Sequence, residues 1–333
     1  MKWIKTGTAV LILAVLVVGC AAAAPQPASN QLIVVGTVSP ITNIIYNIGG
    51  DKIHLSGIVP EGVNSHTFEP APSDAIKLAE ADVIVMNGLG LEDPTLKLAR
   101  ANLKAGAEII LLGEQTLKPD QYAYDFSFPK DGGHPNPHLW TDPILGLRYA
   151  EIIRDALARR DPANAEYYKK NYDAFAQRIK AVDSAMKNTM ASIPPENRKL
   201  LTYHDSFAYF APRYGMTVIG AIQPSDFAEP SAQDVAALIA QIRKEHVPAI
   251  FGSEVFPSPV LEQIARETGA KYVSDLRDDD LPGEPGAPNH SYVGLLVEDV
   301  RLMADALGGD PSLIAGFDTS NIPGADSNVQ QAH

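Results

Sequence analysis

Residues 32–59 read LIVVGTVSPITNIIYNIGGDKIHLSGIV, and this stretch decides the fold because two short runs rich in Val and Ile enclose a helix-like segment. The alternation continues through the segments 72–81, 82–88, 93–107 and 108–114. Continuous apolar runs such as DVIVM are typical of parallel strands that are buried on both faces. The sequence therefore predicts an α/β lobe with four mainly parallel strands over residues 32–143.

The same alternation returns in the second half of the chain. Strand-like runs occur at 199–205, 216–222, 249–256 and 271–276, with helix-like segments between them and a closing helix at 291–308. This pattern predicts a second four-stranded α/β lobe over residues 194–310, followed by a tail at 311–333. About 300 residues are enough for two lobes with cores of their own.

Between the two lobes, residues 144–193 have helical periodicity and no strand-like run. Asp161 followed by Pro162 fits a helix start, with an N-cap residue and proline in the first turn. Nothing breaks the second helix before Pro194, and at 1.5 Å per residue it would be roughly 45 Å long. Its apolar stripe is Tyr168, Tyr172, Phe175, Ile179, Val182 and Met186. One long rigid helix between the lobes predicts that they rock only slightly.

The N-terminus indicates export from the cytoplasm. Lys2 and Lys5 precede a short apolar run at residues 9–18, which matches a secretory signal over residues 1–19 and is too short to span a membrane comfortably. The run ends beside Cys20, the only cysteine of the chain. The segment resembles a bacterial lipobox, so we expect Cys20 to be lipidated and residues 20–31 to form a flexible tether between a lipid membrane and the folded body.

The charge of the chain is acidic, with a formal net charge of −13 at pH 7. Removal of Lys2 and Lys5 with the signal would leave 25 basic and 40 acidic side chains, or −15. No run of Lys and Arg forms a basic patch, which argues against a nucleic-acid partner.

Three histidines stand in similar structural positions, each after a strand-like run or its loop and before a helix-like one. They are His66, His138 and His204, and Asp275 ends the strand-like run KYVSDL. Open α/β sheets gather ligands in the loops beyond the carboxyl ends of their strands. Three imidazoles and one carboxylate in a crevice between the lobes would form a closed four-coordinate site for a divalent metal, most naturally zinc.

The chain resembles the metal-binding solute receptors of bacterial ABC importers for zinc and manganese. The resemblance runs over residues 32–53, 66–92 (HTFEP onward), 136–143 (NPHLWTDP), 203–215 (YHDSFAYFAPRYG) and 272–276 (YVSDL). It implies that His66 and His138 are ligands from the first lobe, and that His204 and Asp275 are ligands from the second. It also implies a monomeric extracytoplasmic or periplasmic lipoprotein with an ABC permease and its ATPase subunit as partners.

The choice of metal depends on position 204. Manganese-type members of that family carry a carboxylate there, whereas this chain has His204. Imidazole suits Zn²⁺ and oxygen ligands suit Mn²⁺, so the sequence favours Zn²⁺ as the transported ion with Mn²⁺ as the alternative. Many zinc receptors have a long histidine-rich loop before the second ligand, but here residues 118–138 hold only His134 besides the ligand. His134 is either an entry-site ligand or an exposed loop histidine.

Several acidic residues near the predicted site have roles that the sequence does not decide. Glu254, at the end of a strand-like run, could hydrogen-bond a ligand histidine, act as an alternative ligand or cap the next helix. The triplet Asp278, Asp279 and Asp280 reads as a solvated loop. Because neutral imidazole binds metal, affinity should fall as the pH drops through the histidine range near 6.5.

Two other classes of function are alternatives to a receptor. A zinc hydrolase needs an open coordination position, but the chain contains no HExxH motif, and Ser206 lacks a G-x-S-x-G elbow. A surface adhesin is the other alternative, and no internal repeat supports it. The sequence therefore predicts a receptor that is not an enzyme.

Overall fold

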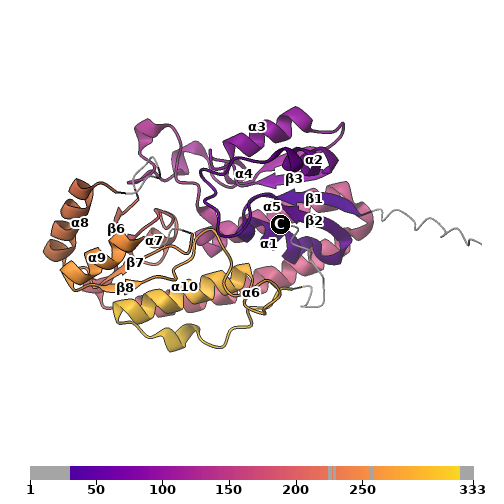
Figure 1. Cartoon of the computed structure of the whole chain (residues 1–333). Helices are drawn as coiled ribbons and strands as arrows, with labels where there is room; N and C mark the ends of the chain where they lie inside the picture. The colour runs from indigo at the N-terminus through magenta and orange to yellow at the C-terminus, as the bar shows by residue number, and fades with distance from the viewer. Residues whose placement is uncertain (1–30, 224–226, 228–229, 256–257, 323–333) are drawn as a thin grey trace, which may run out of the picture. The chain divides into compact units, whose positions relative to one another are not determined.

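The computed structural model describes residues 31–223, 227, 230–255 and 258–322, all within one compact unit, Gln31–His333 (Figure 1). The predicted signal at 1–19, Cys20 and almost all of the tether lie outside the described residues, as does the tail beyond residue 322. Among the described residues, no helix is both long enough and apolar enough to cross a membrane.

The first sheet has four parallel strands in the order β2-β1-β3-β4. Its strands are β1 (Leu32–Gly36), β2 (Ile53–Gly57), β3 (Val83–Met86) and β4 (Glu108–Leu111), and its helices are α1 (Ser39–Gly49), α2 (Pro72–Glu80), α3 (Asp93–Asn102) and α4 (Leu112–Thr116). Val83 to Met86 are all buried, as expected for a central parallel strand with helices on both faces. The carboxyl ends of these strands lie at one edge, where the loop with His66 begins.

The second sheet repeats this topology, with parallel strands in the order β6-β5-β7-β8. Its strands are β5 (Lys199–Thr202), β6 (Thr217–Ala221), β7 (Ala249–Phe251) and β8 (Lys271–Val273), and its helices are α7 (Phe210–Arg213), α8 (Ala232–Glu245), α9 (Pro259–Thr268) and α10 (Tyr292–Leu307). The predicted pair of four-stranded α/β lobes is thus confirmed. The strand β8 ends three residues earlier than expected, with consequences for Asp275.

The connection between the sheets is helical, as predicted. Helix α5 (Pro143–Arg160) is followed by a 3₁₀ turn, η5 (Pro162–Asn164), and by the 27-residue helix α6 (Ala165–Ala191), which is about 40 Å long. Asp161 stands at the N-cap of the 3₁₀ turn, and its carboxylate accepts hydrogen bonds from Asn164 Nδ2 and Tyr168 Oη. The expected helix start at Asp161 is therefore a 3₁₀ turn that leads into α6.

One apolar core joins the two sheets. The cluster includes Val34 of β1, Leu200 of β5 and Phe251 of β7, and it passes through Met186 of α6 and Tyr292 of α10. Helix α6 packs against α5, α1 and α10, and Figure 1 shows α10 running beside α6. The lobes are therefore bound together by shared packing as well as by the connecting chain.

Candidate metal centre

The three predicted histidines meet at one point. The Nε2 atom of His66 lies 3.1 Å from Nε2 of His138 and 3.1 Å from Nε2 of His204, and the last two atoms are 2.9 Å apart. His66 comes from the loop between β2 and α2, His138 precedes the 3₁₀ turn η4 (Leu139–Thr141), and His204 follows β5. Within the described residues, these three form the one group of His, Cys, Asp or Glu side chains compact enough to hold a metal ion.

The spacing of these nitrogens fits a metal ion. A tetrahedral zinc with bonds of about 2.0–2.1 Å has ligand atoms about 3.3–3.4 Å apart. The three Nε2 atoms, 2.9 to 3.1 Å apart, are within a few tenths of an ångström of one face of that tetrahedron. A fourth ligand would complete it.

Two amide side chains orient the imidazoles. Asn136 Oδ1 lies 2.8 Å from Nδ1 of His138, and Gln223 Oε1 lies 2.8 Å from Nδ1 of His204. Asn136 is held in this orientation because its Nδ2 donates to the backbone oxygen of Asp205 and to the Asp125 carboxylate. An acceptor at Nδ1 places the imidazole proton there, so the Nε2 lone pairs of both rings face the centre.

The surroundings keep the imidazoles of His66 and His138 neutral. His138 and His204 are buried, His66 is partly exposed, and the Phe227 ring stacks on His66 with centroids 4.6 Å apart. Burial, and then the charge of His204, holds the pKa values of His66 and His138 well below 6.5. Neutral imidazole is the form that binds metal.

The buried carboxylate of Asp279 contacts the residue that precedes His66. This residue is 3% exposed, and its Oδ2 accepts a hydrogen bond of 2.7 Å from the Ser65 hydroxyl, next to His66. Its Oδ1 is buried without a hydrogen-bond partner. Burial raises the pKa of Asp279, while the charge of His204 opposes that rise. A buried carboxylate oxygen without a hydrogen-bond partner is a candidate metal ligand, although Asp279 lies outside the compact group formed by the three histidines.

The structure does not place Asp275 in the compact group of three histidines, so its part in the predicted ligand set stays a prediction. Strand β8 ends at Val273, so Asp275 lies in the exposed part of the loop that follows. The expectation of a solvated loop at residues 278–280 is wrong, because all three aspartates are buried. The sequence therefore provides no reason to prefer Asp279 over Asp275 as a candidate ligand.

Glu254 supports the aspartate loop instead of touching a histidine. Its Oε1 accepts the backbone N–H groups of Asp278, Asp279 and Asp280 at 3.1, 3.2 and 3.0 Å. Burial, followed by the charges of Asp278 and Asp279, raises the pKa of Glu254 well above its ordinary value. These contacts differ from each of the three roles left open by the sequence, because they support the loop at residues 278–280.

His134 is exposed and lies apart from the cluster. It lines a pocket of about 240 Å³ together with His66, Leu89 and Phe128.

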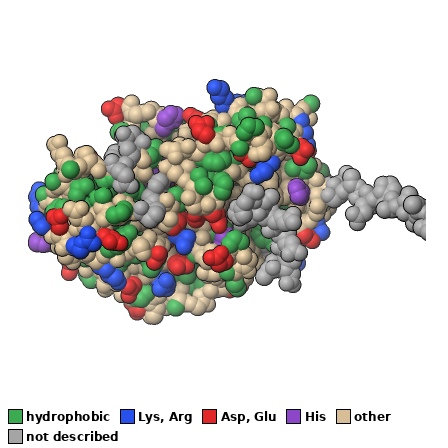
Figure 2. All heavy atoms as spheres, viewed as in Figure 1, with side chains coloured by type: hydrophobic (Ala, Val, Ile, Leu, Met, Phe, Trp, Pro, Cys, Tyr) green, Lys and Arg blue, Asp and Glu red, His purple; other side chains and the backbone are tan. Residues whose placement is uncertain are grey.

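On the face seen in Figure 2, Lys and Arg side chains are spread among acidic ones.

The cluster thus draws its histidines from both lobes. His66 and His138 follow the first sheet, whereas His204 follows β5 of the second. Two α/β lobes, a long connecting helix and a compact trio of imidazoles define a metal-binding receptor. The chain belongs to the family described as zinc-uptake complex component A, periplasmic, whose model matches residues 34–306.

Known relatives agree with this class. The chain is 32% identical over 284 residues to the iron-binding protein YfeA of Yersinia pestis, which covers 85% of this chain and 89% of that one. It is 28% identical to the manganese ABC transporter substrate-binding lipoprotein PsaA of Streptococcus mitis, over 91% and 99% of the two chains. The solved periplasmic zinc binding protein TroA of Treponema pallidum superimposes with a TM-score of 0.75 at 26% identity, covering 83% and 99%. The protein is a substrate-binding component of a metal ABC transporter.

Proposed function

We propose that this receptor captures Zn²⁺ with His66, His138, His204 and Asp279 and delivers it to an ABC permease driven by its ATPase subunit. The observation that carries the proposal is the triangle of Nε2 atoms, 2.9 to 3.1 Å on each side. Its lone pairs converge because Asn136 and Gln223 occupy the Nδ1 atoms of two of the rings.

The donor set favours zinc over harder ions. Three imidazole nitrogens suit Zn²⁺, while Mn²⁺ prefers additional oxygen ligands. The Ser65 hydroxyl engages Oδ2 of Asp279, which leaves Oδ1 to bind the ion. One oxygen and three nitrogens make a four-coordinate site, as is usual for closed zinc sites.

Manganese is the second candidate, because Asp279 could bind through both oxygens if its hydrogen bond to Ser65 opened. The added oxygen would raise the coordination number and soften the preference for zinc. The relatives include the manganese receptor PsaA and the iron-binding protein YfeA, which supports an ion other than zinc as the second candidate.

Delivery follows from the division of ligands between the lobes. An ion bound by His66, His138 and His204 ties the loops after both sheets together, so the bound state is the more tightly closed one. We expect a monomer, anchored through Cys20 outside the cytoplasm, that presents the closed form to its permease. With Asp279 in the fourth position no site is left open for a reacting water, which argues for capture and against hydrolysis.

The test is metal content by mass spectrometry and zinc titration of the metal-free protein. We compare the native chain with His204→Ala and Asp279→Ala, and use His54→Ala and Asp275→Ala as matched controls because both of these residues are exposed. We expect one zinc per chain, lost or weakened by about a hundredfold or more in the first pair and unchanged in the controls.

Each other result has a clear meaning. Stoichiometric manganese in place of zinc would keep the receptor and overturn the choice of metal. Loss of zinc in Asp275→Ala, with Asp279→Ala unaffected, would restore the ligand set predicted from the sequence. No stoichiometric binding of either metal by the native chain would refute the proposed function.

A further inference from the structure

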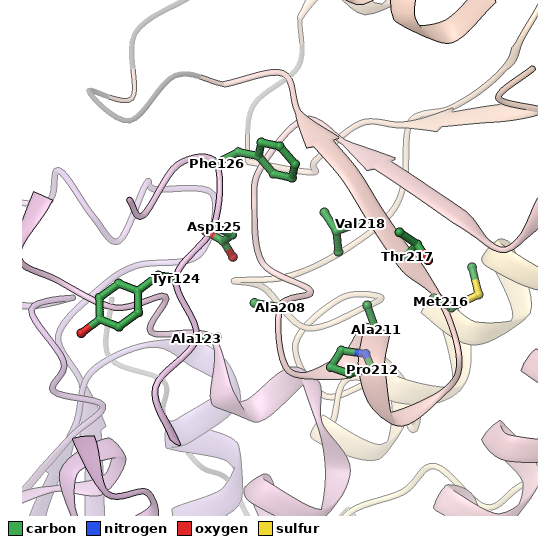
Figure 3. Close-up of a pocket in the computed structure, with 10 residues that line it drawn as sticks. All are labelled: Ala123, Tyr124, Asp125, Phe126, Ala208, Ala211, Pro212, Met216, Thr217 and Val218. Atoms are coloured by element: carbon green, nitrogen blue, oxygen red, sulfur yellow. The ribbon is translucent and has the colours of Figure 1, made fainter. Parts of the chain in front are cut away.

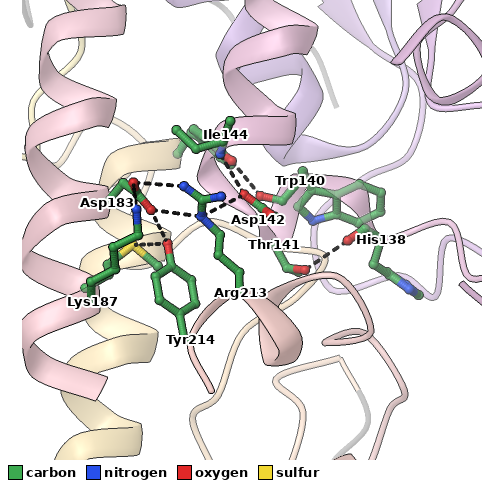
Figure 4. A network of polar contacts seen from close by, with 11 residues as sticks. His138, Trp140, Thr141, Asp142, Ile144, Asp183, Lys187, Arg213 and Tyr214 are labelled. Atoms are coloured by element: carbon green, nitrogen blue, oxygen red, sulfur yellow. Dashed lines mark hydrogen bonds and ion pairs between the residues drawn. The ribbon is translucent and has the colours of Figure 1, made fainter. Parts of the chain in front are cut away.

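A polar network lies where the two lobes meet the long helix α6 (Figure 4). At its centre is Arg213, the last residue of α7 in the second lobe. Its Nε and one terminal nitrogen each donate a hydrogen bond of 2.9 Å to the carboxylate of Asp183 in α6. Its Nε also lies 3.5 Å from Oδ1 of Asp142, the N-cap residue of α5 beside the first lobe. One guanidinium therefore links its own element, α7, to α6 and to the start of α5.

The chain segments that carry His138 and His204 both reach this network within a few residues. Asp142 comes four residues after His138, and Arg213 comes nine residues after His204. Between them, the Thr141 hydroxyl lies 2.9 Å from the backbone oxygen of His138 and 3.0 Å from that of Ser206. The backbones beside the two histidines are thus joined to each other and, through Arg213, to the helix.

The network is held firmly at its helix end. Besides the fork from Arg213, the carboxylate of Asp183 accepts hydrogen bonds of 2.9 Å from Lys187 and 2.8 Å from the Tyr214 hydroxyl. Although burial raises the pKa of Asp183, these donors bring it below its ordinary value, so the residue is an anion near neutral pH. A bidentate arginine pair fixes direction as well as distance, which a lysine could not do.

On another side of α7 the packing between the lobes is open. A mostly apolar pocket of about 590 Å³ separates Ala211, Pro212 and Val218 of the second lobe from the loop at residues 123–126 (Figure 3). Beside this pocket the Tyr209 hydroxyl still joins the two sides, because it accepts the Ala123 N–H at 3.2 Å and donates to the Asn136 backbone oxygen at 3.0 Å. The Arg213 contacts are therefore the charged link among several polar contacts around α7.

We propose that Arg213 is the pivot of the receptor: a positioning residue that sets the spacing of His138 and His204 by anchoring both of their segments to α6. This inference rests on the proposed metal capture. The ion holds the lobes together at the crevice, and Arg213 holds them at the helix. Without that anchor the His204 segment moves away from the ion more readily, so bound zinc should leave faster.

The experiment measures the rate of zinc release from the loaded protein after mixing with an excess of chelator. The variants are Arg213→Gln, Arg213→Lys, Asp142→Asn and the double variant Arg213→Gln/Asp142→Asn. Asparagine at position 142 can still accept the Ile144 N–H that caps α5, so this variant removes the charge and keeps the cap. The control is Arg154→Gln, whose side chain is 22% exposed against 24% for Arg213. It forms ion pairs with Glu151 and Asp155 and lies over the Tyr172 ring.

We expect Arg213→Gln and Asp142→Asn to speed release by about fivefold or more. Arg213→Lys should lie between Arg213→Gln and the native protein, and the control should not change. The double variant should release zinc no faster than Arg213→Gln, because both changes remove the same link. If Arg213→Gln does not fold, Asp142→Asn decides the question by itself.

Zinc release within twofold of the native rate in folded variants would overturn the pivot. A lower melting temperature of their metal-free forms would not rescue it, because an ion pair with a purely structural role would also lower that temperature. Rate effects that multiply in the double variant would also overturn it. If the native protein holds no zinc to release, the proposed function fails and the pivot falls with it. Native binding with unaltered variant rates removes the pivot alone.

Discussion

At the scale of single residues, the metal centre depends on which nitrogen of each imidazole carries the proton. Gln223 fixes this for His204 through a contact of 2.8 Å to Nδ1. We predict that Gln223→Ala weakens zinc binding by about 10- to 100-fold, because the ring is then free to turn and to protonate at Nε2. Competition titration with a chelator measures the effect, and Gln263→Ala, on the exposed face of α9, is the control. Native affinity in Gln223→Ala would show that the ring is oriented by its packing alone.

The same imidazoles predict how stability depends on pH. Because burial and the charge of His204 lower the pKa values of His66 and His138 in the folded state, the unfolded chain takes up protons first as the pH falls. The contribution of these two histidines to the free energy of unfolding is complete above about pH 6.5. Below that pH it is lost, by up to about 1.4 kcal/mol per pH unit for each histidine. Proton competition with zinc should likewise begin below 6.5, lower than the sequence alone suggests.

Denaturant unfolding of the metal-free protein at about pH 7.5, 6 and 5 measures this slope. Buried acids act in the opposite sense: burial and the neighbouring Asp205 raise the pKa of Asp125 to about 8, so its contribution falls as the pH rises towards that value. The difference between the native chain and His138→Gln cancels such terms. Equal slopes for the two proteins would contradict the prediction.

The sequence identified the histidines but not the buried carboxylate, for a physical reason. Each histidine follows a strand or its loop, and parallel strands bring those loops to one edge, so their meeting follows from topology. Asp275 and Asp279 differ by four positions in one loop, and pattern alone cannot tell which of them turns inward. That depends on β8 ending at Val273 and on Glu254, a distant residue in sequence, holding the later part of the loop.

At the scale of elements, the loop at 278–280 connects the two lobes through hydrogen bonds. Trp140 Nε1 donates to the Asp278 backbone oxygen at 2.8 Å, and Asp280 Oδ2 accepts the Gly62 N–H at 2.6 Å. Both contacts join the second lobe to residues near His66 and His138. The shape of this loop therefore governs the spacing of the ligands.

Glu254 holds that loop through three backbone N–H groups, so its acceptor oxygen matters more than its charge. We predict that Glu254→Gln, which keeps an oxygen in place, binds zinc within about threefold of the native protein, whereas Glu254→Ala loses about tenfold or more because three N–H groups are left unpaired. Zinc titration of both variants measures this, with exposed Glu262→Ala as control. Equal losses in the Gln and Ala variants would mean that the negative charge is what counts.

At the scale of the whole molecule, sequence reasoning predicted two lobes and the helix between them, but it treated the lobes as separate cores. Periodicity indicates which face of an element is apolar and does not identify what that face packs against. Helices α1, α5 and α10 all pack on α6, and Leu200 of the second sheet belongs to the same cluster as Val34 of the first. The shared core gives a physical basis for the expectation that the lobes rock only slightly.

A shared core also predicts how the protein unfolds. Because one apolar cluster runs from the first sheet through α6 to the second, the metal-free receptor should unfold in one cooperative transition, with calorimetric and van't Hoff enthalpies nearly equal. Zinc at a hundred times its dissociation constant adds about 2.7 kcal/mol, so the single midpoint should rise by roughly 4 °C. Scanning calorimetry with and without zinc measures both, and His204→Ala should show no rise. Two resolved transitions, or a zinc-induced rise confined to part of the heat absorption, would mean that the lobes unfold independently and meet only at the ion.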